Sequence, residues 1–446
     1  MAQAPELFSE ETFKAVESAL WPRRVALSLL INVLDKNHTL DDTLESSADF
    51  SRLQQRDRAF VRMLVTTTLR RLGQIDDLIA HALAKPDEEI KPQALLHILR
   101  LGVTQLVFMN TADFAAVDTS VELANASGLS RQKGFVNGVL RTIGREGKSW
   151  TSAQDIPRLI TPDWLLRSWI MDYGLPQSLA IANAHLQEAA LDITPSNPAE
   201  AASLAEILQG LVLPSGNIRV LEPEGRVETL PGFKEGAWWV QDAASALPAK
   251  LFGTISGEHV IDLCAAPGGK TAQLVAMGAN VTAIDRSTSR LKRLHENIKR
   301  LNFTSRVDVV CVDAASWRPK TLVRHVLVDA PCSATGTLRR HPDLAWLKGE
   351  RDVENLIQVQ RKLIDNALSM LERGGTLIYC TCSLQKSEGE AHFQNLNGAY
   401  IKPIERSEVP GLEQAVTPEG FLRITPAMWA DKGGIDGFFI ARLVKE

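Results

Sequence analysis

Two short segments of the chain carry cysteines where nucleophilic chemistry is expected. They are Asp329–Ser333, which contains Cys332, and Tyr379–Ser383, which contains Cys382, and each closes an apolar run typical of a buried strand. Each cysteine precedes a serine, which indicates a turn rather than the interior of a core. Because a cysteine thiolate is a strong nucleophile, the two thiols indicate covalent chemistry on an electrophilic ring.

The surroundings of a cysteine decide whether its thiol reacts. A reactive cysteine needs a nearby cation or a helix N-terminus to reach the thiolate form, and Arg339–His341 and Lys386 follow the two candidate segments. A lone cysteine in an apolar strand is more often a small packing residue. We therefore predict that Cys264 and Cys311 are packing residues.

The Gly-rich turn Cys264–Lys270 follows the first predicted strand and is expected to approach a cofactor. Its Pro267–Gly269 centre leaves little side chain between the backbone and a ligand. Asp285 ends the second strand, where a carboxylate can accept hydrogen bonds from both ribose hydroxyls, and Asp313 follows the third strand, near an adenine amino group. These features fit one adenosine-containing ligand. The alternative, a tight turn with two unrelated carboxylates, stays open.

Two other nucleotide-binding motifs do not match this turn. A P-loop needs a glycine where the chain has Cys264, although Gly269–Thr271 fits the rest of that motif. A dinucleotide fingerprint needs G-x-G-x-x-G, and the glycine spacing of the turn fails it.

The elements that position these residues follow from apolar periodicity. Apolar steps of three and four residues from about 22 to 145 predict an all-α domain, and Pro and Gly punctuation from 151 to about 248 predicts a small α+β module. Beyond residue 258, apolar runs alternate with amphipathic stretches, which predicts a parallel sheet wound by helices. The predicted strands are 259–263, 281–285, 307–310, 326–329 and 376–379, and the predicted helices between them are 287–301 and 353–371. The predicted divisions are an N-terminal extension at 1–21, the all-α domain at 22–148, the module at 149–248 and a catalytic domain at 249–446.

Composition narrows the class of protein. The chain has 446 residues and a formal net charge of -4, so any nucleic-acid surface has to be local. Five cysteines without metal-ligand spacing favour a reducing compartment and no metal. Since no apolar run is long enough to cross a bilayer, we expect a cytoplasmic protein without membrane contact.

Basic residues recur in two places and are candidates for phosphate contacts. The alternative, a solvated helix face, is the usual meaning of such charge runs and stays open. The helical domain carries Arg52, Arg56, Arg58, Arg62, Arg70, Arg71, Arg131, Lys133, Arg141 and Arg145, and the stretch Arg286–Arg306 carries seven further basic residues against the single acidic Glu296.

Several long motifs resemble one known family. Asp329–Asp343, Gly374–Ser383 and the Cys264–Lys270 turn resemble the RNA cytosine-5 methyltransferases of the Fmu/Sun (RsmB) group. Further segments resemble the NusB-like RNA-binding domain that precedes the catalytic domain in that group, namely Arg56–Arg58, Leu69–Arg71, Gly102–Leu106 and Val136–Arg141. Pro162–Leu166, Val240–Asp242 and Asp436–Phe439 extend the resemblance over nearly the whole chain.

The resemblance implies a multidomain fold: an all-α NusB-like bundle, a small α+β linker module and a Rossmann-like methyltransferase domain. It also implies S-adenosylmethionine as cofactor, with Cys382 as nucleophile and Cys332 assisting product release. The implied cofactor-binding residues are Cys264, Ala265, Ala266, Pro267, Gly268, Gly269, Lys270, Asp285, Asp313 and Asp329. The implied activity is methylation of cytosine C5 in 16S small-subunit ribosomal RNA by a monomer. A transfer RNA methyltransferase and a non-catalytic RNA-binding assembly factor remain alternatives.

The chain departs from the pattern of that group at three places. Lys386 stands where the group usually has a proline, and Gly389 stands where it usually has an asparagine. In the middle module Asp192–Thr194 replaces an Arg-x-Asn pattern. The last difference puts in question whether the module contacts RNA.

Overall fold

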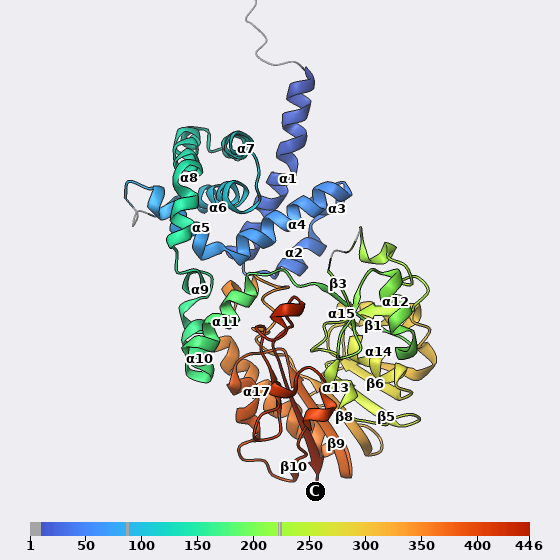
Figure 1. The fold of residues 1–446 in the computed structure, drawn as a ribbon. Coiled ribbons are helices and arrows are strands. Elements are labelled where there is room, and N and C mark those ends of the chain that lie inside the picture. The colour runs from blue at the N-terminus through green and yellow to red at the C-terminus, as the bar shows by residue number, and fades with distance from the viewer. Residues whose placement is uncertain (1–9, 86–88, 222, 224) are drawn as a thin grey trace, which may run out of the picture. The chain divides into compact units, whose positions relative to one another are not determined.

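The computed structural model describes residues 10–85, 89–221, 223 and 225–446, and the chain forms two compact units (Figure 1). The first unit takes the described residues up to Arg167 together with the short segment His341–Leu347. The second unit takes Ser168–Arg340 and Lys348–Glu446. The segment His341–Leu347 therefore interrupts the second unit in sequence but belongs to the first.

The first unit is built from α-helices around one apolar core, as the apolar periodicity predicted. Its helices are α1 (Glu10–Leu34), α2 (Leu40–Ser46), α3 (Ala48–Arg52), α4 (Gln55–Arg70), α5 (Leu72–Ala82), α6 (Gln93–Val103), α7 (Asp113–Ala126), α8 (Lys133–Ala153) and α9 (Ile156–Leu159). Helix α8 packs closely on α6, because a Cβ at Gly102 would lie 2.7 Å from Leu140 Cδ1. It also continues past residue 148, where the sequence placed a division. Residues 1–9 of the predicted N-terminal extension lie outside the described residues.

The segment His341–Leu347 is held in the first unit by polar contacts as well as by packing. Asp343 Oδ2 accepts a hydrogen bond of 2.9 Å from the Leu40 backbone N–H at the start of α2. Trp346 Nε1 donates to the Leu69 carbonyl at 2.8 Å, and Trp346 and Leu347 pack against the helical core. The short helix α16 (Leu344–Leu347) is therefore a sequence-distant part of the bundle.

A small antiparallel sheet, ordered β2-β3-β1-β4, forms the middle module. Its elements are β1 (Leu191–Pro195), α12 (Ala201–Ile207), β2 (Leu211–Val212), β3 (Ile218–Val220) and β4 (Trp238–Val240). Two helices, α10 (Asp163–Tyr173) and α11 (Leu175–His185), precede the module in the chain. Asp192 of β1 lies opposite Arg219 of β3, and two hydrogen bonds of 2.7 Å join their fully buried side chains. The departure from the family pattern at Asp192 therefore places a buried ion pair inside the module.

The large sheet has the order β10-β12-β9-β8-β5-β6-β7, with β11 paired to β12. Its strands are β5 (His259–Leu263), β6 (Asn280–Asp285), β7 (Val307–Cys311), β8 (Val323–Asp329), β9 (Leu371–Thr381), β10 (Ala399–Ile401), β11 (Leu422–Ile424) and β12 (Phe438–Lys445). Strands β5 to β9 pair in parallel, as the alternating pattern predicted. The antiparallel strands β10 to β12 were not predicted. Strands β10 and β11 are only three residues long, whereas β12 has eight residues and was overlooked.

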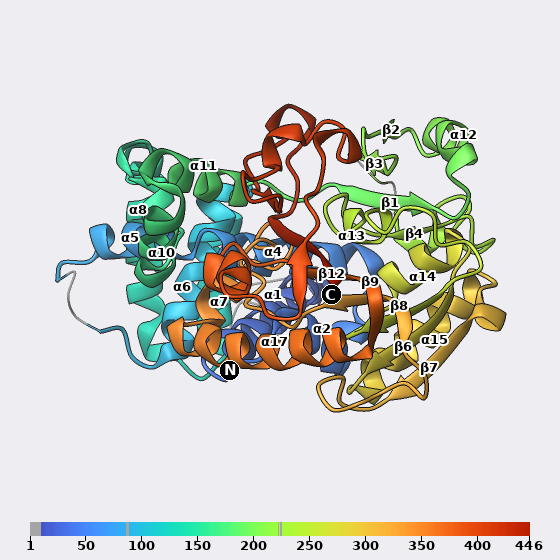
Figure 2. The ribbon, with the colours of Figure 1, turned by 90° about the horizontal axis from the view of Figure 1, so that it is seen from below.

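Helices cover both faces of this sheet. The helices are α13 (Leu247–Lys250), α14 (Gly269–Ala276), α15 (Thr288–Arg300) and α17 (Glu350–Met370). Helix α17 packs against β8 and β9 (Figure 2), and its apolar side chains share a core with Ile261 of β5. The neighbouring Val260 lies in a second core with side chains of α14 and α15. Alternate strand residues thus face opposite helical layers, and the carboxyl ends of β5 to β9 meet at one edge.

Candidate active site

The two candidate thiols lie side by side at the carboxyl ends of neighbouring strands. Cys382 directly follows β9 and Cys332 lies three residues beyond β8, and their Sγ atoms are 3.5 Å apart. Two backbone hydrogen bonds of 2.9 Å join the segments, from Ala330 N to the Cys380 carbonyl and from Gly336 N to the Cys382 carbonyl. Parallel pairing of β8 and β9 therefore brings together two cysteines separated by fifty positions.

The electrostatic surroundings favour a protonated Cys332. Its hydrogen bond with the Cys382 sulfur is the largest cause that raises the pKa of Cys332 well above its ordinary value, and burial is the second. Burial likewise raises the pKa of Cys264 to about 12 and the pKa of Cys380 well above its ordinary value. Cys332 is therefore a thiol that can donate a proton to the sulfur of Cys382.

A cavity of about 250 Å³ opens beside the thiols at the same edge of the sheet. It is lined by Cys264, Asp285, Arg286, Arg290, Asp313, Ala314, Asp329, Ala330, Pro331, Cys332, Ala334, Val359, Leu363 and Cys382. The structure thus gathers six of the residues singled out in the sequence around one space. Ala265 to Lys270 lie behind this lining rather than in it.

The Gly-rich turn is fixed by contacts on both of its sides. Ala266 N donates to Asp285 Oδ2 at 3.2 Å, and Cys264 adopts a left-handed backbone with φ of 63°. Gly268 has φ of 101°, and a Cβ there would lie 2.9 Å from Leu294 Cγ of α15. The glycine at 268 is therefore required by its backbone conformation and by the approach of α15.

Lys270 lies at the start of α14, but its side chain is directed to another residue of the site. Its Nζ donates to Asp329 Oδ2 at 2.7 Å and to Ser245 Oγ at 3.0 Å. Burial is the largest influence and acts to lower the pKa of Lys270, but the Asp329 carboxylate, together with Cys380 and Cys382, raises that pKa above its ordinary value. The Cys380 thiol donates to the other Asp329 oxygen at 3.5 Å. Asp329 is therefore held on both sides, two residues before the Pro-Cys dipeptide.

Four of the larger side chains in the lining were not predicted to be there, namely Arg286, Arg290, Val359 and Leu363. Arg290 Nη1 lies 3.6 Å from Asp285 Oδ2, and its Nη2 donates to the Ala266 carbonyl. The sequence had assigned Arg290 only to a basic stretch. Its position five residues after Asp285, on the first turn of α15, was the available signal.

The predicted packing role of Cys311 is wrong. Cys311 ends β7, which is the outer strand of the sheet, and it is exposed. An edge strand has a neighbour on one side only, so apolar sequence alone overstated its burial. Cys264 packs against the apolar core, as expected, but it is only partly buried and also lines the cavity.

The two departures after Cys382 have local structural reasons. The Lys386 backbone N–H donates to Asp172 Oδ2 of α10 at 3.1 Å, which proline could not do. A Cβ at Gly389 would lie 2.5 Å from Arg423 Nη2 and 2.9 Å from the Phe439 ring. Arg423 in turn donates to the Ser383 carbonyl at 2.6 Å. The Arg423 side chain therefore occupies the space that a side chain at position 389 would need.

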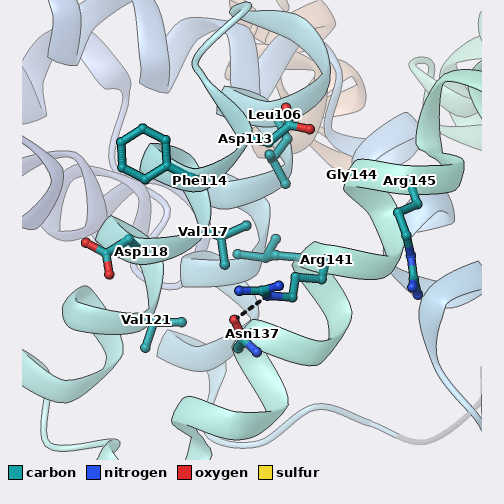
Figure 3. A pocket seen from close by; sticks show the side chains of 11 residues that line it. Leu106, Asp113, Phe114, Val117, Asp118, Val121, Asn137, Arg141, Gly144 and Arg145 are labelled. Atoms are coloured by element: carbon teal, nitrogen blue, oxygen red, sulfur yellow. Dashed lines mark hydrogen bonds between the residues drawn. The ribbon is translucent and has the colours of Figure 1, made fainter.

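The basic residues of the helical unit include packed and exposed ones. The Arg71 guanidinium lies 4.6 Å from the Phe108 ring centroid and donates to Gln74 at 2.8 Å, so it serves packing. Arg141 and Arg145 of α8 are exposed. They line a groove of about 510 Å³ between α7 and α8, where Arg141 Nε donates to Asn137 Oδ1 at 3.0 Å (Figure 3).

The rim of this groove is mixed in character. Phe114 stands at the rim with 79% of its surface exposed, and Asp113 and Asp118 contribute carboxylates beside it (Figure 3). Leu106 and Val117 contribute apolar lining. The groove belongs to the helical unit and shares no residue with the cavity beside the thiols.

The sheet order, the cavity at the strand ends and the paired thiols define a Rossmann-like methyltransferase preceded by a helical domain. Residues 251–444 match the family model of the 16S rRNA methyltransferase RsmB/F, and residues 21–145 match the NusB family. The chain is 32% identical to the ribosomal RNA small subunit methyltransferase B of Vibrio cholerae over 95% of its own length and 97% of the relative. It is 33% identical to the protein of that name from Escherichia coli O1:K1, over 95% and 98%. The chain belongs to the RsmB/F family of methyltransferases, and its cofactor is S-adenosylmethionine.

Solved structures share the fold. The crystal structure of PH0851 has a TM-score of 0.72 at 22% identity and covers 95% of this chain and 99% of its own. The structure of NSun6 from Pyrococcus horikoshii with SFG has a TM-score of 0.54 at 21% identity, over 64% of this chain and 98% of its own. Both likenesses concern the fold.

The lining of the cavity fits the donors of an adenosine group. Asp285, Asp313 and Asp329 supply carboxylate oxygens, which accept hydrogen bonds, and ribose hydroxyls and an adenine amino group donate them. Asp285 is 3% exposed, and its oxygens are oriented by the N–H groups of Ala266 and Ser287.

Neither a metal-binding cluster nor a membrane-spanning helix is present among the described residues. Among the residues that the structure describes, no group of three or more His, Cys, Asp or Glu side chains is arranged to hold a metal ion. None of the described helices is both long enough and apolar enough to cross a membrane.

Proposed function

We propose that this protein methylates C5 of a cytosine in small-subunit ribosomal RNA through a covalent bond between Cys382 and C6 of the ring. The observation that carries the proposal is the 3.5 Å separation of two sulfurs beside a carboxylate-lined cavity. The names of the relatives in Vibrio cholerae and Escherichia coli support ribosomal RNA as the substrate.

C5 of cytosine is too weak a nucleophile to take up a methyl group by itself, so the enzyme has to activate the ring with a nucleophile of its own. Addition of the Cys382 thiolate to C6 makes C5 electron-rich, and S-adenosylmethionine, when bound, supplies the methyl group that C5 takes up. A base then removes the C5 proton, and the bond between sulfur and C6 breaks with return of the electron pair to sulfur. Each turnover thus leaves Cys382 unchanged.

The neighbouring groups suit the other steps. Cys332 holds its proton next to the Cys382 sulfur, so it can protonate the departing thiolate as product is released. Asp329 lines the same cavity and is oriented by Lys270, which suits it to accept hydrogen bonds from the amino edge of the target ring.

A substrate that traps the covalent intermediate tests the proposal. With RNA containing 5-fluorocytosine, the ring carries fluorine where a proton must leave, so wild-type protein should remain joined to RNA. Cys382→Ala should give no joined species, whereas Cys332→Ala should accumulate one even on ordinary RNA. Gel shift under denaturing conditions and mass spectrometry measure both. The opposite pattern would exchange the roles of the two cysteines.

The cellular target is tested separately. Bisulfite sequencing of ribosomal and transfer RNA, from cells with and without the gene, should show one 5-methylcytosine lost from the small-subunit RNA. Loss of a site in transfer RNA alone would instead support the transfer RNA alternative. No change in either RNA would favour a non-catalytic assembly role.

We also propose that the helical unit contributes affinity for RNA rather than chemistry. The exposed Arg141 and Arg145 are suited to phosphate contacts. The exposed Phe114 ring, which lines the same groove, is suited to stacking on an unpaired base.

A further inference from the structure

Glu388 is fully buried behind the two thiols, and four hydrogen bonds converge on its carboxylate. Oε1 accepts from the Ser333 backbone N–H and from Gln360 Nε2, both at 2.9 Å. Oε2 accepts from the Ser333 hydroxyl at 2.5 Å and from the Ser383 hydroxyl at 2.6 Å. One carboxylate therefore binds the residue that follows Cys332 and the residue that follows Cys382.

The position of Glu388 is itself fixed. The Tyr379 hydroxyl donates to the Glu388 carbonyl at 3.0 Å, and Tyr379 is completely buried in β9. Gln360 of α17 also donates to the Pro331 carbonyl at 2.9 Å, directly before Cys332. The carboxylate thus connects both cysteine turns to the sheet and to α17.

Backbone hydrogen bonds already join the two cysteine turns, and the Glu388 carboxylate adds a side-chain connection between the residues that directly follow the cysteines. Both cysteines lie outside their strands, since β8 ends at Asp329 and β9 ends at Thr381. The hydroxyls of the two serines that follow them are only 3.1 Å apart. Both hydroxyls need an acceptor in this buried place, and Glu388 Oε2 accepts from both. The distance between the serines, and with it the distance between the adjacent sulfurs, is therefore set at Glu388.

We propose that Glu388 is a positioning residue, which sets the distance between the Cys332 and Cys382 sulfurs by clamping Ser333 and Ser383 to one carboxylate. Glu388 does not line the cavity beside the thiols, so it acts through the two serines rather than on a ligand. The value of the clamp for catalysis rests on the proposed cytosine chemistry, but the clamp itself does not.

The distance between the sulfurs can be measured without RNA. Diamide oxidises two neighbouring thiols: each sulfur gives up one hydrogen atom to the N=N bond, a hydrazine forms, and the sulfurs become bonded. The rate at which the Cys332–Cys382 disulfide forms is followed by peptide mass mapping of the full-length protein. This rate reports how well the sulfurs are held together. Trapping on 5-fluorocytosine RNA provides a second readout.

Glu388→Gln should slow both the Cys332–Cys382 disulfide and adduct formation by about tenfold or more, because a displacement of about 1 Å in a site has effects of that size. Affinity for S-adenosylmethionine, measured by calorimetry, should stay at the wild-type value, since Glu388 does not line that cavity. Glu388→Asp, which keeps the carboxylate, should recover part of both rates. Glu408→Gln is the matched control, because Glu408 is held by Arg442 and lies outside the cavity lining.

The outcomes separate this proposal from the proposed function. A folded Glu388→Gln protein with wild-type disulfide and adduct rates would overturn the clamp. If Glu388→Gln slows the disulfide while wild-type protein never traps 5-fluorocytosine RNA, the clamp stands and the cytosine chemistry fails. Should Glu388→Gln not fold, Ser383→Ala and Ser333→Ala each remove one hydroxyl donor and should slow the disulfide in the same direction. Unchanged rates in both serine variants would equally overturn the proposal.

Discussion

Lys270 and Asp329 form a salt bridge, with Nζ 2.7 Å from Oδ2, that joins the Gly-rich turn to the strand leading to Cys332. The Lys270 side chain is 7% exposed and that of Asp329 35% exposed, so the pair is partly shielded from water. The bond connects two functional segments that lie far apart in sequence. A residue assigned to the cofactor turn by its position thus also orients a carboxylate beside the thiols.

Replacement of Lys270 by methionine should cost about 1–3 kcal/mol of unfolding free energy, because Asp329 loses its cation. This is less than for a fully buried pair, since water partly screens Asp329. Urea unfolding measures the loss. The double variant Lys270→Met with Asp329→Asn should lose less than the sum of the single variants. Additive losses would contradict a direct interaction between the two side chains.

Stability should depend on pH through Asp262, whose pKa is raised to about 7 by burial. The unfolded carboxyl titrates near its ordinary value, about 4, so between about pH 4 and 7 the folded protein binds the extra proton. The contribution of the Asp262 carboxyl to the free energy of unfolding is therefore fully present below about pH 4 and is lost as pH rises through 7. Urea unfolding across this range should show a flatter slope for Asp262→Asn than for wild type. Equal slopes would show that Asp262 does not titrate near 7.

Restoring the family residue at 389 should harm this protein. Gly389→Asn places a Cβ 2.5 Å from Arg423 Nη2 and close to the Phe439 ring, and overpacking of this kind costs about 1–3 kcal/mol. Arg423 cannot turn away freely, because it also binds Glu390 and the Ser383 carbonyl. Thermal unfolding measures the loss. Gly398→Asn is the control, since a Cβ at Gly398 meets no atom within 4 Å, although its φ of 72° adds some strain.

Charge reversal on α8 should weaken RNA binding. Arg141→Glu with Arg145→Glu should lower affinity and reduce the salt dependence of binding, because each phosphate contact releases counterions. Affinity for S-adenosylmethionine should stay unchanged. Arg158→Glu with Arg226→Glu makes the same change in net charge at two exposed residues, paired with Asp155 and Glu228, and is the control. Equal RNA affinity in all of these proteins would favour the solvated-face alternative.

Much of the fold was readable because the relevant signals are local. The run 259–263 became β5 without adjustment, since a buried parallel strand is a continuous apolar run that ends at a turn. The places of Cys332 and Cys382 at the ends of two strands were also predicted, whereas the contact between their sulfurs was not. Short antiparallel strands such as Ala399–Ile401 were missed because three residues carry too little pattern.

The roles of individual polar side chains were less readable, because they depend on contacts between distant segments. Lys270 looked like a residue of the cofactor turn, and its partner Asp329 lies 59 positions away. Arg71 looked like a phosphate ligand, but it packs on Phe108. Glu388 carries no motif signal for its position between two serines, one of which lies 55 positions away.

The segment His341–Leu347 has a consequence for any attempt to separate the two units. A single cut after Arg167 would leave this segment attached to the second unit, with Trp346 and Leu347 deprived of the helical core they pack on. The same cut would strip the helical unit of the Asp343 contact to the start of α2. The two units therefore cannot be separated intact by a single break in the chain.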